Sequence, residues 1–316
     1  MGRYLITGGC GFIGSHLAER LLKEGHAVRV LDDLSTGKRD NVSPSAELIV
    51  GSVTDAELVR AAMDGIDGCF HLAGIASVVR GTQDWVGTHG VNLTGTITVF
   101  NAARRADGKS GGNVGIPVVY ASSAAVYGDE ATMPLTEASP TRPLSAYGAD
   151  KLGCEQHARV AGIVHGVPTA GLRLFNVFGP RQDPQSPYSG VISIFCNRLT
   201  AGEAIKIFGD GMQSRDFVYI DDVIAALTAA MTKISERTRV ATLIYNVCTG
   251  RPTTIIELAN LIGELCGRKP EIGFAPPRAD DIRISIGSAD RLRADLGIAC
   301  STDLKDGLRV TLASLR

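Results

Sequence analysis

Apolar residues follow two alternating patterns along most of the chain. Short, almost continuous apolar runs alternate with longer segments in which apolar side chains recur at the spacing of one helix face. The runs, which we interpret as buried strands, are Arg3–Thr7, Val28–Leu31, Glu47–Val50, Gly68–Leu72, Val118–Ser122, Thr169–Phe175 and Leu243–Val247. Strands that alternate with helices in this way predict an α/β fold with a doubly wound parallel sheet.

The character of the sequence changes after Phe175. Residues 176–184 are polar and rich in turn-forming residues, so we expect a loop there. Beyond it we expect a helix at Val191–Thr200, short strands at Ile205–Phe208 and Phe217–Ile220, and two tail helices at Ile255–Gly267 and Ala289–Leu296. The sequence therefore predicts one domain at residues 1–175, to which 218–247 return, and a smaller, partly interleaved C-terminal substrate lobe at 176–217 and 248–316.

A glycine-rich turn joins the first expected strand to the first expected helix. Gly8 allows the tight turn, Gly11 lets the backbone approach a pyrophosphate, and Gly14 lets the helix pack on the strand. The free N–H groups of the helix start favour phosphate. Asp32 ends the next strand, where a carboxylate accepts hydrogen bonds from an adenosine ribose and repels a 2′-phosphate. The pattern predicts a Rossmann domain that binds NAD in preference to NADP, although Lys38 and Arg39 leave NADP open.

A tyrosine and a lysine stand four residues apart at Tyr147 and Lys151. In a helix they lie on one face, so the ammonium of Lys151 is expected to stabilise a phenolate on Tyr147. An unperturbed tyrosine ionises near a pH of ~10, too high for a base at neutral pH. Together with a hydroxyl at the strand end Ser122–Ser123 and a nucleotide site, this pair predicts hydride transfer at an alcohol or sugar carbon.

Composition narrows the functional class without defining it. The 316 residues carry a net charge of −1 and are 44% hydrophobic, so bulk charge gives no case for binding nucleic acid or a membrane. The seven cysteines are scattered and odd in number, which favours buried thiols in a reducing compartment over metal ligands or disulfides. We expect a cytoplasmic protein without a metal site. His71, alone at a strand end, is interpreted as structural.

These motifs resemble the extended short-chain dehydrogenase/reductase family, and within it the nucleotide-sugar 4-epimerases. The resemblance covers nearly the whole chain and rests on the segments Gly8–Gly14, His71–Gly74, Ala121–Gly128, Tyr147–Lys151, Arg173–Arg181, Ser214–Tyr219 and Pro277–Ile282. It implies an isomerase with tightly bound NAD, in which Tyr147 takes the proton from the sugar O4 while C4 gives its hydride to nicotinamide. Ser123 hydrogen-bonds O4, Lys151 holds the cofactor ribose, and the 4-keto sugar turns over before the hydride returns.

The same resemblance and the glycine-rich motif indicate which residues bind the two ligands. Those expected to contact NAD are Gly8, Gly11, Phe12, Ile13, Gly14, Asp32, Asp33, Ser35, Thr36, Gly37, Ser52, Val53, Leu72, Ala73, Gly74, Asn92, Ser122, Tyr147, Lys151 and Phe175. Those expected to contact the UDP-sugar are Ser77, Ser123, Tyr147, Asn176, Gln182, Val191, Ile207, Phe208, Arg215, Arg278, Asp281 and Ser285. Asn176, Arg215 and Arg278 would hold the diphosphate, and Ile207–Phe208 would flank the uracil.

The identity of the sugar stays open between related alternatives. Ala124 and Ala125 stand where dehydratases and decarboxylases of the family usually carry an acid, which argues against both. A small residue at Ser285 favours acceptance of UDP-N-acetylglucosamine. The alternatives are a UDP-glucose/UDP-galactose 4-epimerase without acetamido activity and, with Arg181 as a candidate cation, a UDP-glucuronate 4-epimerase. A non-catalytic NAD-binding regulator is the hypothesis from another class. Relatives of this kind imply a homodimer.

Overall fold

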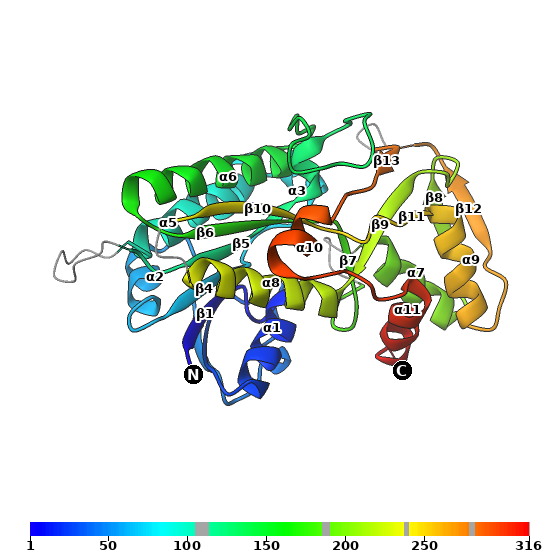
Figure 1. Cartoon of the computed structure of the whole chain (residues 1–316). Coiled ribbons are helices and arrows are strands. Elements are labelled where there is room, and N and C mark those ends of the chain that lie inside the picture. The colour runs from blue at the N-terminus through cyan, green and yellow to red at the C-terminus, as the bar shows by residue number, and fades with distance from the viewer. Residues whose placement is uncertain (105–113, 185–189, 237–239, 278–281, 316) are drawn as a thin grey trace.

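A parallel sheet forms the centre of the computed structural model, which describes residues 1–104, 114–184, 190–236, 240–277 and 282–315. In this part of the chain the central sheet has seven strands in the order β10-β6-β5-β4-β1-β2-β3 (Figure 1). Their bounds are β1 Arg3–Thr7, β2 Ala27–Asp32, β3 Glu47–Val50, β4 Gly68–His71, β5 Val118–Ser123, β6 Thr169–Leu174 and β10 Thr242–Val247. The order reverses between β1 and β4, which is where doubly wound sheets bind their ligands. The predicted fold class is confirmed.

Helices cover both faces of this sheet, so its strands are apolar on both sides. The helices α1 (Phe12–Lys23) and α8 (Ile220–Ser235) lie on one face, and α2 (Ala56–Ala62), α5 (Gly95–Ala102) and α6 (Ala146–His165) lie on the other. Successive side chains of β1 enter opposite cores: Leu5 packs with the cluster under α2, α5 and α6, and Ile6 with the cluster under α1 and α8.

A second, smaller sheet lies beside the carboxyl ends of β5 and β6. Its central strand β9 (Ser214–Tyr219) pairs with β7 (Asn176–Phe178), β11 (Pro252–Thr254) and β13 (Ile284–Ser285). A separate parallel pair joins β8 (Ile205–Phe208) to β12 (Ile272–Ala275). The helices α7 (Val191–Ala201), α9 (Ile255–Leu265) and α11 (Leu304–Ala313) belong to this region, whereas α10 (Asp290–Leu296) packs on α8 and β10 of the central sheet. The chain passes from β6 to β7 and from β9 to α8 with hardly a linking residue.

Several local expectations were wrong. The expected loop at 176–184 begins with β7, because this segment finds β9 as a partner. The expected loop between residues 75 and 88 contains α3 (Val78–Gln83) and α4 (Trp85–His89), followed by a π-helical turn, η2 (Gly90–Thr94). The tail carries a third helix, α11, besides the two expected. Short 3₁₀ turns, η1 (Arg39–Asn41) and η3 (Ala124–Tyr127), complete the fold.

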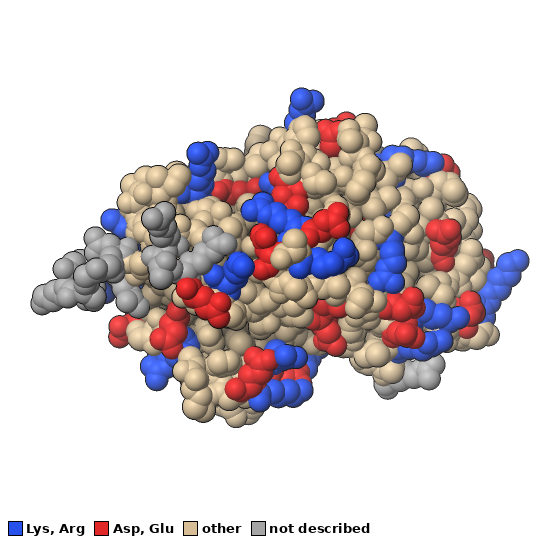
Figure 2. Space-filling view, viewed as in Figure 1, with Lys and Arg blue, Asp and Glu red and all other residues tan. Residues whose placement is uncertain are grey.

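On the face shown in Figure 2, basic and acidic side chains are interspersed, and neither charge forms a large patch. All seven cysteines are free thiols, and of these only Cys266 is partly exposed. Within the described residues, no helix has the length and apolarity needed to cross a membrane. The same residues contain no group of histidine, cysteine and acidic side chains arranged to hold a metal ion.

Candidate functional site

In the glycine-rich turn between β1 and α1, protein packing requires Gly8 and Gly14, whereas Gly11 leaves room for a ligand. Gly8 has a φ of +72°, and a Cβ there would lie 2.7 Å from the amide nitrogen of Ala73. A Cβ on Gly14 would lie only 2.2 Å from the Gly8 carbonyl oxygen. A Cβ on Gly11 would meet nothing closer than 3.3 Å, and Gly11 is the N-cap of α1 without a side-chain cap. The amides of the first turn of α1 therefore face open space, as phosphate binding requires.

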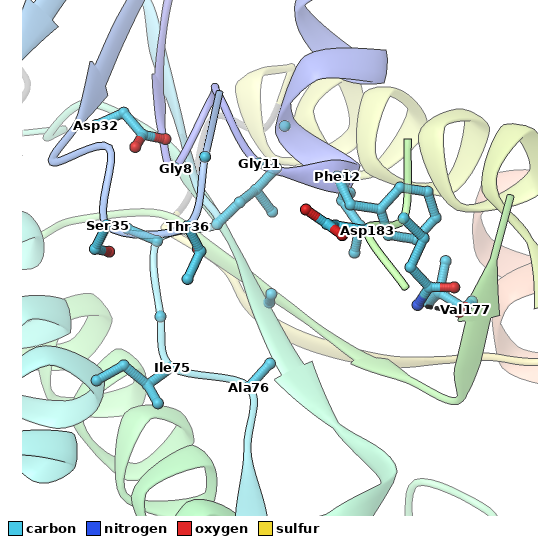
Figure 3. Close-up of a pocket in the computed structure, with 18 of the residues that line it drawn as sticks. Gly8, Gly11, Phe12, Asp32, Ser35, Thr36, Ile75, Ala76, Val177 and Asp183 are labelled. Atoms are coloured by element: carbon cyan, nitrogen blue, oxygen red, sulfur yellow. Dashed lines mark hydrogen bonds between the residues drawn. The ribbon is translucent and has the colours of Figure 1, made fainter. Parts of the chain in front are cut away.

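A cavity of about 700 Å³ extends from this turn across the carboxyl ends of the central strands (Figure 3). The cavity brings together most residues predicted to contact NAD: Gly8, Gly11, Phe12, Ile13, Gly14, Asp32, Asp33, Ser35, Thr36, Gly37, Val53, Leu72, Ala73, Gly74, Ser122, Tyr147, Lys151 and Phe175. Its size is typical of a small-molecule site. Its lining includes both the first turn of α1, where phosphates are expected, and Lys151.

Asp32 lies in the cavity at the end of β2, where the sequence places it against the adenosine ribose. Its Oδ2 accepts the N–H of Cys10 at 2.9 Å and its Oδ1 the N–H of Leu34 at 2.8 Å. Burial raises the pKa of this carboxyl, while the two N–H donors act in the opposite direction. The two hydrogen bonds fix the carboxylate at the cavity wall, so the residues present fit NAD.

Two residues predicted to contact NAD, Ser52 and Asn92, do not line the cavity. Ser52 does not line the cavity, and its hydroxyl pairs with that of Thr54 at 2.8 Å. Asn92 also lies outside the cavity lining, but its amide bridges the backbone of Ile75, accepting its N–H at 2.7 Å and donating to its carbonyl at 3.1 Å. Asn92 therefore holds the segment after β4 in place along the cavity.

The three predicted catalytic residues, Ser123, Tyr147 and Lys151, all line this cavity. Helix α6 begins one residue before Tyr147, because Ser145 caps it by accepting the N–H of Gly148 at 3.1 Å. The Nζ of Lys151 lies 5.9 Å from the centre of the Tyr147 ring and donates to the Ala121 carbonyl at 2.8 Å. The Oγ of Ser123 accepts the N–H of Ala125 at 3.1 Å, which leaves the Ser123 hydroxyl hydrogen free to donate.

A smaller cavity of about 220 Å³ adjoins the first, with Ser123, Leu174, Phe175 and Asn176 common to both. Its remaining lining residues are Ala124, Ala125, Arg215, Ile282 and Ser285. Three predicted substrate residues, Asn176, Arg215 and Ser285, are thus brought together next to the catalytic serine. Arg278 and Asp281 fall outside the described residues.

Other predicted substrate residues do not reach either cavity through their side chains. Ser77 caps α3 by accepting the N–H of Arg80 at 3.0 Å. Ile207 is 1% exposed and belongs to the hydrophobic core, and Val191 packs against that core at the start of α7. Phe208 is half-buried, with the Lys206 ammonium 5.6 Å from its ring centre.

The segment after β7 closes one rim of the larger cavity. Gln182 lines it, as predicted, and donates to the Val177 carbonyl at 3.4 Å. Arg181 does not extend toward the smaller cavity: its guanidinium pairs with Glu19 on α1. Asp183 forms an ion pair with Lys38 at 2.8 Å, joining this segment to the loop after β2. Figure 3 shows Asp183 directed to the cavity beside Phe12.

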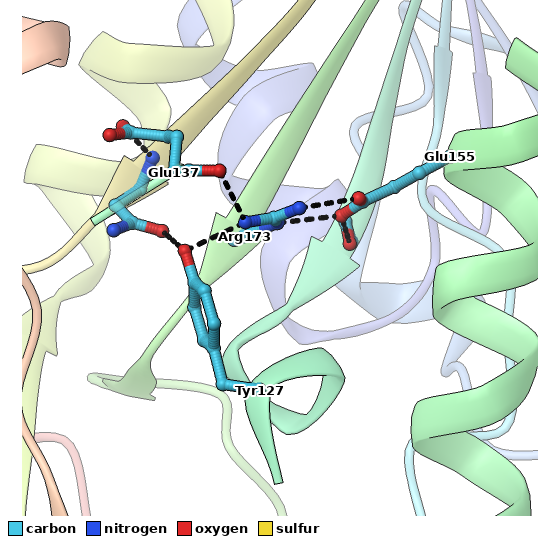
Figure 4. Close-up of polar contacts among 6 residues, drawn as sticks. Tyr127, Glu137, Glu155 and Arg173 are labelled. Atoms are coloured by element: carbon cyan, nitrogen blue, oxygen red, sulfur yellow. Dashed lines mark hydrogen bonds and ion pairs between the residues drawn. The ribbon is translucent and has the colours of Figure 1, made fainter. Parts of the chain in front are cut away.

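Sequence reasoning missed a buried polar network beneath the catalytic residues (Figure 4). The carboxylate of Glu155 binds the guanidinium of Arg173, which also donates to the hydroxyl of Tyr127 at 2.9 Å. That hydroxyl donates to Asn246 at 2.6 Å, and Glu137 accepts the N–H of Asn246 at 2.7 Å. One signal was available, since Glu155 follows Lys151 by four residues and therefore lies on the same helix face.

His71 is structural, as interpreted from the sequence. Its Nδ1 lies 2.7 Å from the hydroxyl of Thr7 and its Nε2 lies 2.9 Å from that of Thr96. Burial, with a further contribution from the positive charge of Lys151, lowers the pKa of His71 to about 3. The imidazole is therefore neutral at physiological pH and lies buried beneath the strand end, outside the cavity lining.

Known proteins resemble this chain over its whole length. Residues 4–248 match the NAD dependent epimerase/dehydratase family. The chain is 36% identical to the UDP-glucose 4-epimerase of Mycolicibacterium smegmatis, with 99% of this chain and 98% of that protein covered. The UDP-glucose 4-epimerase of Thermotoga maritima, solved with UDP-glucose, has a TM-score of 0.91 at 33% identity and coverage of 99% and 98%. A UDP-N-acetylglucosamine 4-epimerase of Methanobrevibacter ruminantium M1, solved with UDP-N-acetylmuramic acid, has a TM-score of 0.90 at 31% identity and the same coverage.

Proposed function

Because the chain belongs to the NAD dependent epimerase/dehydratase family, we propose that it is a UDP-sugar 4-epimerase that interconverts gluco and galacto forms through a 4-keto intermediate. The enzyme is an isomerase with NAD as its cofactor. The observation that carries the reaction is that Ser123, Tyr147 and Lys151 all line the larger cavity, and that Ser123 also lines the smaller one.

When bound, NAD would supply the acceptor for the C4 hydride and the donor that returns it to the other face of the sugar. Tyr147 takes the O4 proton in the first half of the reaction and returns it in the second. The ammonium of Lys151 lies 5.9 Å from the centre of the Tyr147 ring, and its bond to the Ala121 carbonyl holds it at the cavity lining. Ser123 donates its free hydrogen to O4. Because the reaction needs no further acid or base, the alanines at 124 and 125 are compatible with it.

We propose that the diphosphate anchors the substrate while the sugar turns over. Arg215 lines the smaller cavity, and a guanidinium fork suits phosphate oxygens. Asn176 lies between this site and the catalytic serine. Binding energy placed in the nucleotide rather than in the sugar leaves the hexose free to present either face of C4.

UDP-N-acetylglucosamine is our proposed substrate. The lining of the smaller cavity supports it, because Ala124, Ala125 and Ser285 are small and leave room for an acetamido group. The alternative is an enzyme that interconverts only UDP-glucose and UDP-galactose, in line with the names of the M. smegmatis and T. maritima relatives. UDP-glucuronate is disfavoured because its candidate cation, Arg181, binds Glu19 instead.

The apolar surface of two helices supports a homodimer. On α6, Val160, Ile163 and Val164 are exposed, and Ile97 is exposed on the neighbouring helix α5. Exposed apolar side chains on two helices that contact each other are typical of a helix-to-helix interface between copies. The free and mostly buried thiols support a reducing location, which we propose is the cytoplasm.

Proton NMR of the purified protein with each UDP-sugar, and with no added NAD, tests the proposal. Conversion of UDP-N-acetylglucosamine to its galacto epimer is the expected result. Conversion of UDP-galactose alone would reject the acetamido substrate and keep the reaction. No conversion of any UDP-sugar, with NAD bound only reversibly, would instead support a non-catalytic regulator.

Two variants make the test specific to residues. Tyr147→Phe should retain NAD and lose epimerisation, because only the proton-transferring hydroxyl is removed; full activity would refute the role of Tyr147. Ser285→Tyr should narrow the smaller cavity, so that turnover of the acetamido sugar falls while turnover of UDP-galactose persists. Equal loss with both sugars would contradict the role of Ser285 as a specificity residue.

A further inference from the structure

A buried ion pair lies directly beneath the catalytic strand and helix. Arg173 on β6 is the register partner of Ser122 on β5, and Glu155 lies one turn beyond Lys151 on α6. The guanidinium donates from Nε to Glu155 Oε1 at 2.9 Å and from Nη2 to Oε2 at 2.7 Å, a two-bond fork. Both side chains are 6% exposed. Burial opposes the charge of Arg173, but the bonds and charge of Glu155 outweigh it and raise the pKa of Arg173.

The same carboxylate fixes the strand that carries the catalytic serine. Glu155 Oε1 also accepts the hydroxyl of Ser122 at 2.6 Å. One residue earlier, the Ala121 carbonyl accepts from Lys151 at 2.8 Å. Helix α6 is thus bonded to β5 at two successive residues immediately before Ser123. The spacing between Ser123 on the strand and Tyr147 on the helix depends on these two bonds.

Further hydrogen bonds connect Arg173 to a segment that lines the smaller cavity. Its Nη1 donates to the Tyr127 hydroxyl at 2.9 Å, and that hydroxyl donates to Asn246 Oδ1 at 2.6 Å. The Nδ2 of Asn246 donates to the carbonyls of Leu135 at 2.9 Å and Ser288 at 3.3 Å. Ser288 lies three residues beyond Ser285, which lines the smaller cavity. The catalytic strand and the sugar cavity wall therefore share one hydrogen-bonded frame.

Stability alone is a weak reason for an ion pair at this depth. Replacing a buried pair by apolar residues of similar size is often neutral or stabilising, because desolvation offsets the attraction. Geometry is the stronger reason, since a displacement of about 1 Å in a reacting group can cost about a hundredfold in rate. We propose that Glu155 and Arg173 are positioning residues that hold Ser123 and Tyr147 on the same substrate oxygen. This inference rests on the reaction proposed above.

Steady-state kinetics on variants of the NAD-loaded enzyme test this role. Glu155→Gln should lower kcat about 10- to 100-fold per bound NAD, with KM for the UDP-sugar within about twofold, because Arg215 and the nucleotide site are untouched. Ser122→Ala removes only the hydroxyl that binds Glu155, and should lower kcat about two- to tenfold. Glu47→Gln, which removes the partner of Arg29 on β2, is the matched control and should leave kcat unchanged.

A double variant separates positioning from folding. Glu155→Leu with Arg173→Met replaces the pair by apolar side chains, so Tm should stay close to that of the wild type while kcat stays low. A Tm loss with wild-type kcat per bound NAD would mean that the pair only stabilises the fold. Wild-type kcat in Ser122→Ala would overturn the proposal even if the Glu155 variants fail to fold. An inactive wild type would refute the proposed reaction itself, and with it this role.

Discussion

Protonation of His71 should destabilise the protein below neutral pH. The Thr96 hydroxyl donates to the Asn92 carbonyl at 2.5 Å, so it has to accept at its contact with His71 Nε2. Nε2 therefore carries the hydrogen, and Nδ1 accepts the hydroxyl of Thr7. A second proton on Nδ1 would break the bond to Thr7 and place a charge in a fully buried position. The network thus specifies one neutral tautomer.

The size of the stability loss follows from the pKa shift of His71. The pKa of His71 falls from 6.5 to about 3 on folding. Between these two pH values the unfolded chain binds a proton that the native protein does not, so stability falls as the pH falls. Each pH unit in this window costs about 1.4 kcal/mol, which makes the loss at pH 5 about 2 kcal/mol. Above pH 6.5 the contribution is constant.

Urea unfolding at pH 7.5 and pH 5, in saturating NAD, measures this loss. The wild type should lose about 2 kcal/mol more between the two conditions than His71→Gln, which cannot take up the proton. His157→Gln, at an exposed position of α6, is the control and should follow the wild type. If the free energy of unfolding changed equally with pH in the wild type and in His71→Gln, the conclusion that His71 is buried and neutral would be refuted.

Three further expectations concern the cavity and the surface. Gly14→Ala should unfold the turn and lower Tm, because its Cβ would lie 2.2 Å from a backbone oxygen. Gly11→Ala should fold with an unchanged Tm but bind NAD weakly in a titration. Asp183→Asn breaks the ion pair with Lys38. Because exposed ion pairs contribute about 1 kcal/mol or less, the Kd for NAD should rise by no more than about fivefold. A wild-type Kd that does not change with salt concentration would contradict this expectation. Ile163→Lys should yield monomers in sedimentation if α6 forms the dimer interface, and an unchanged mass would exclude that face.

The parts of the site that could be predicted depend on local spacing. The turn at Gly8–Gly14 and the pair Tyr147 and Lys151 are set by the geometry of one helix start and one helix face, which the sequence displays directly. The central strands were predictable for a similar reason, because a sheet buried on both faces requires continuous apolar runs.

The rest depends on partners that are distant in sequence. β7 is a strand because β9 lies beside it: Val177 and Phe178 favour a strand, but a run of 3 residues is too short to predict one. The same holds for Arg173, whose partners lie 18 and 46 residues away. Two predicted substrate residues that line neither cavity have a local reason for their position. Ser77 is placed as a helix cap by its own hydroxyl, and Ile207 faces inward because Ile205 and Ile207 alternate with the exposed Lys206.

The direct passages between the two sheets limit how the molecule can open. The chain leaves the central sheet after Leu174 and enters β7 at Asn176, returns from β9 into α8 at Ile220, and leaves again between Val247 and Pro252. A hinge would have to bend at all of these connections together, and the first two have almost no free residues. Substrate entry and the inversion of the sugar therefore have to be accommodated by side chains and rim loops.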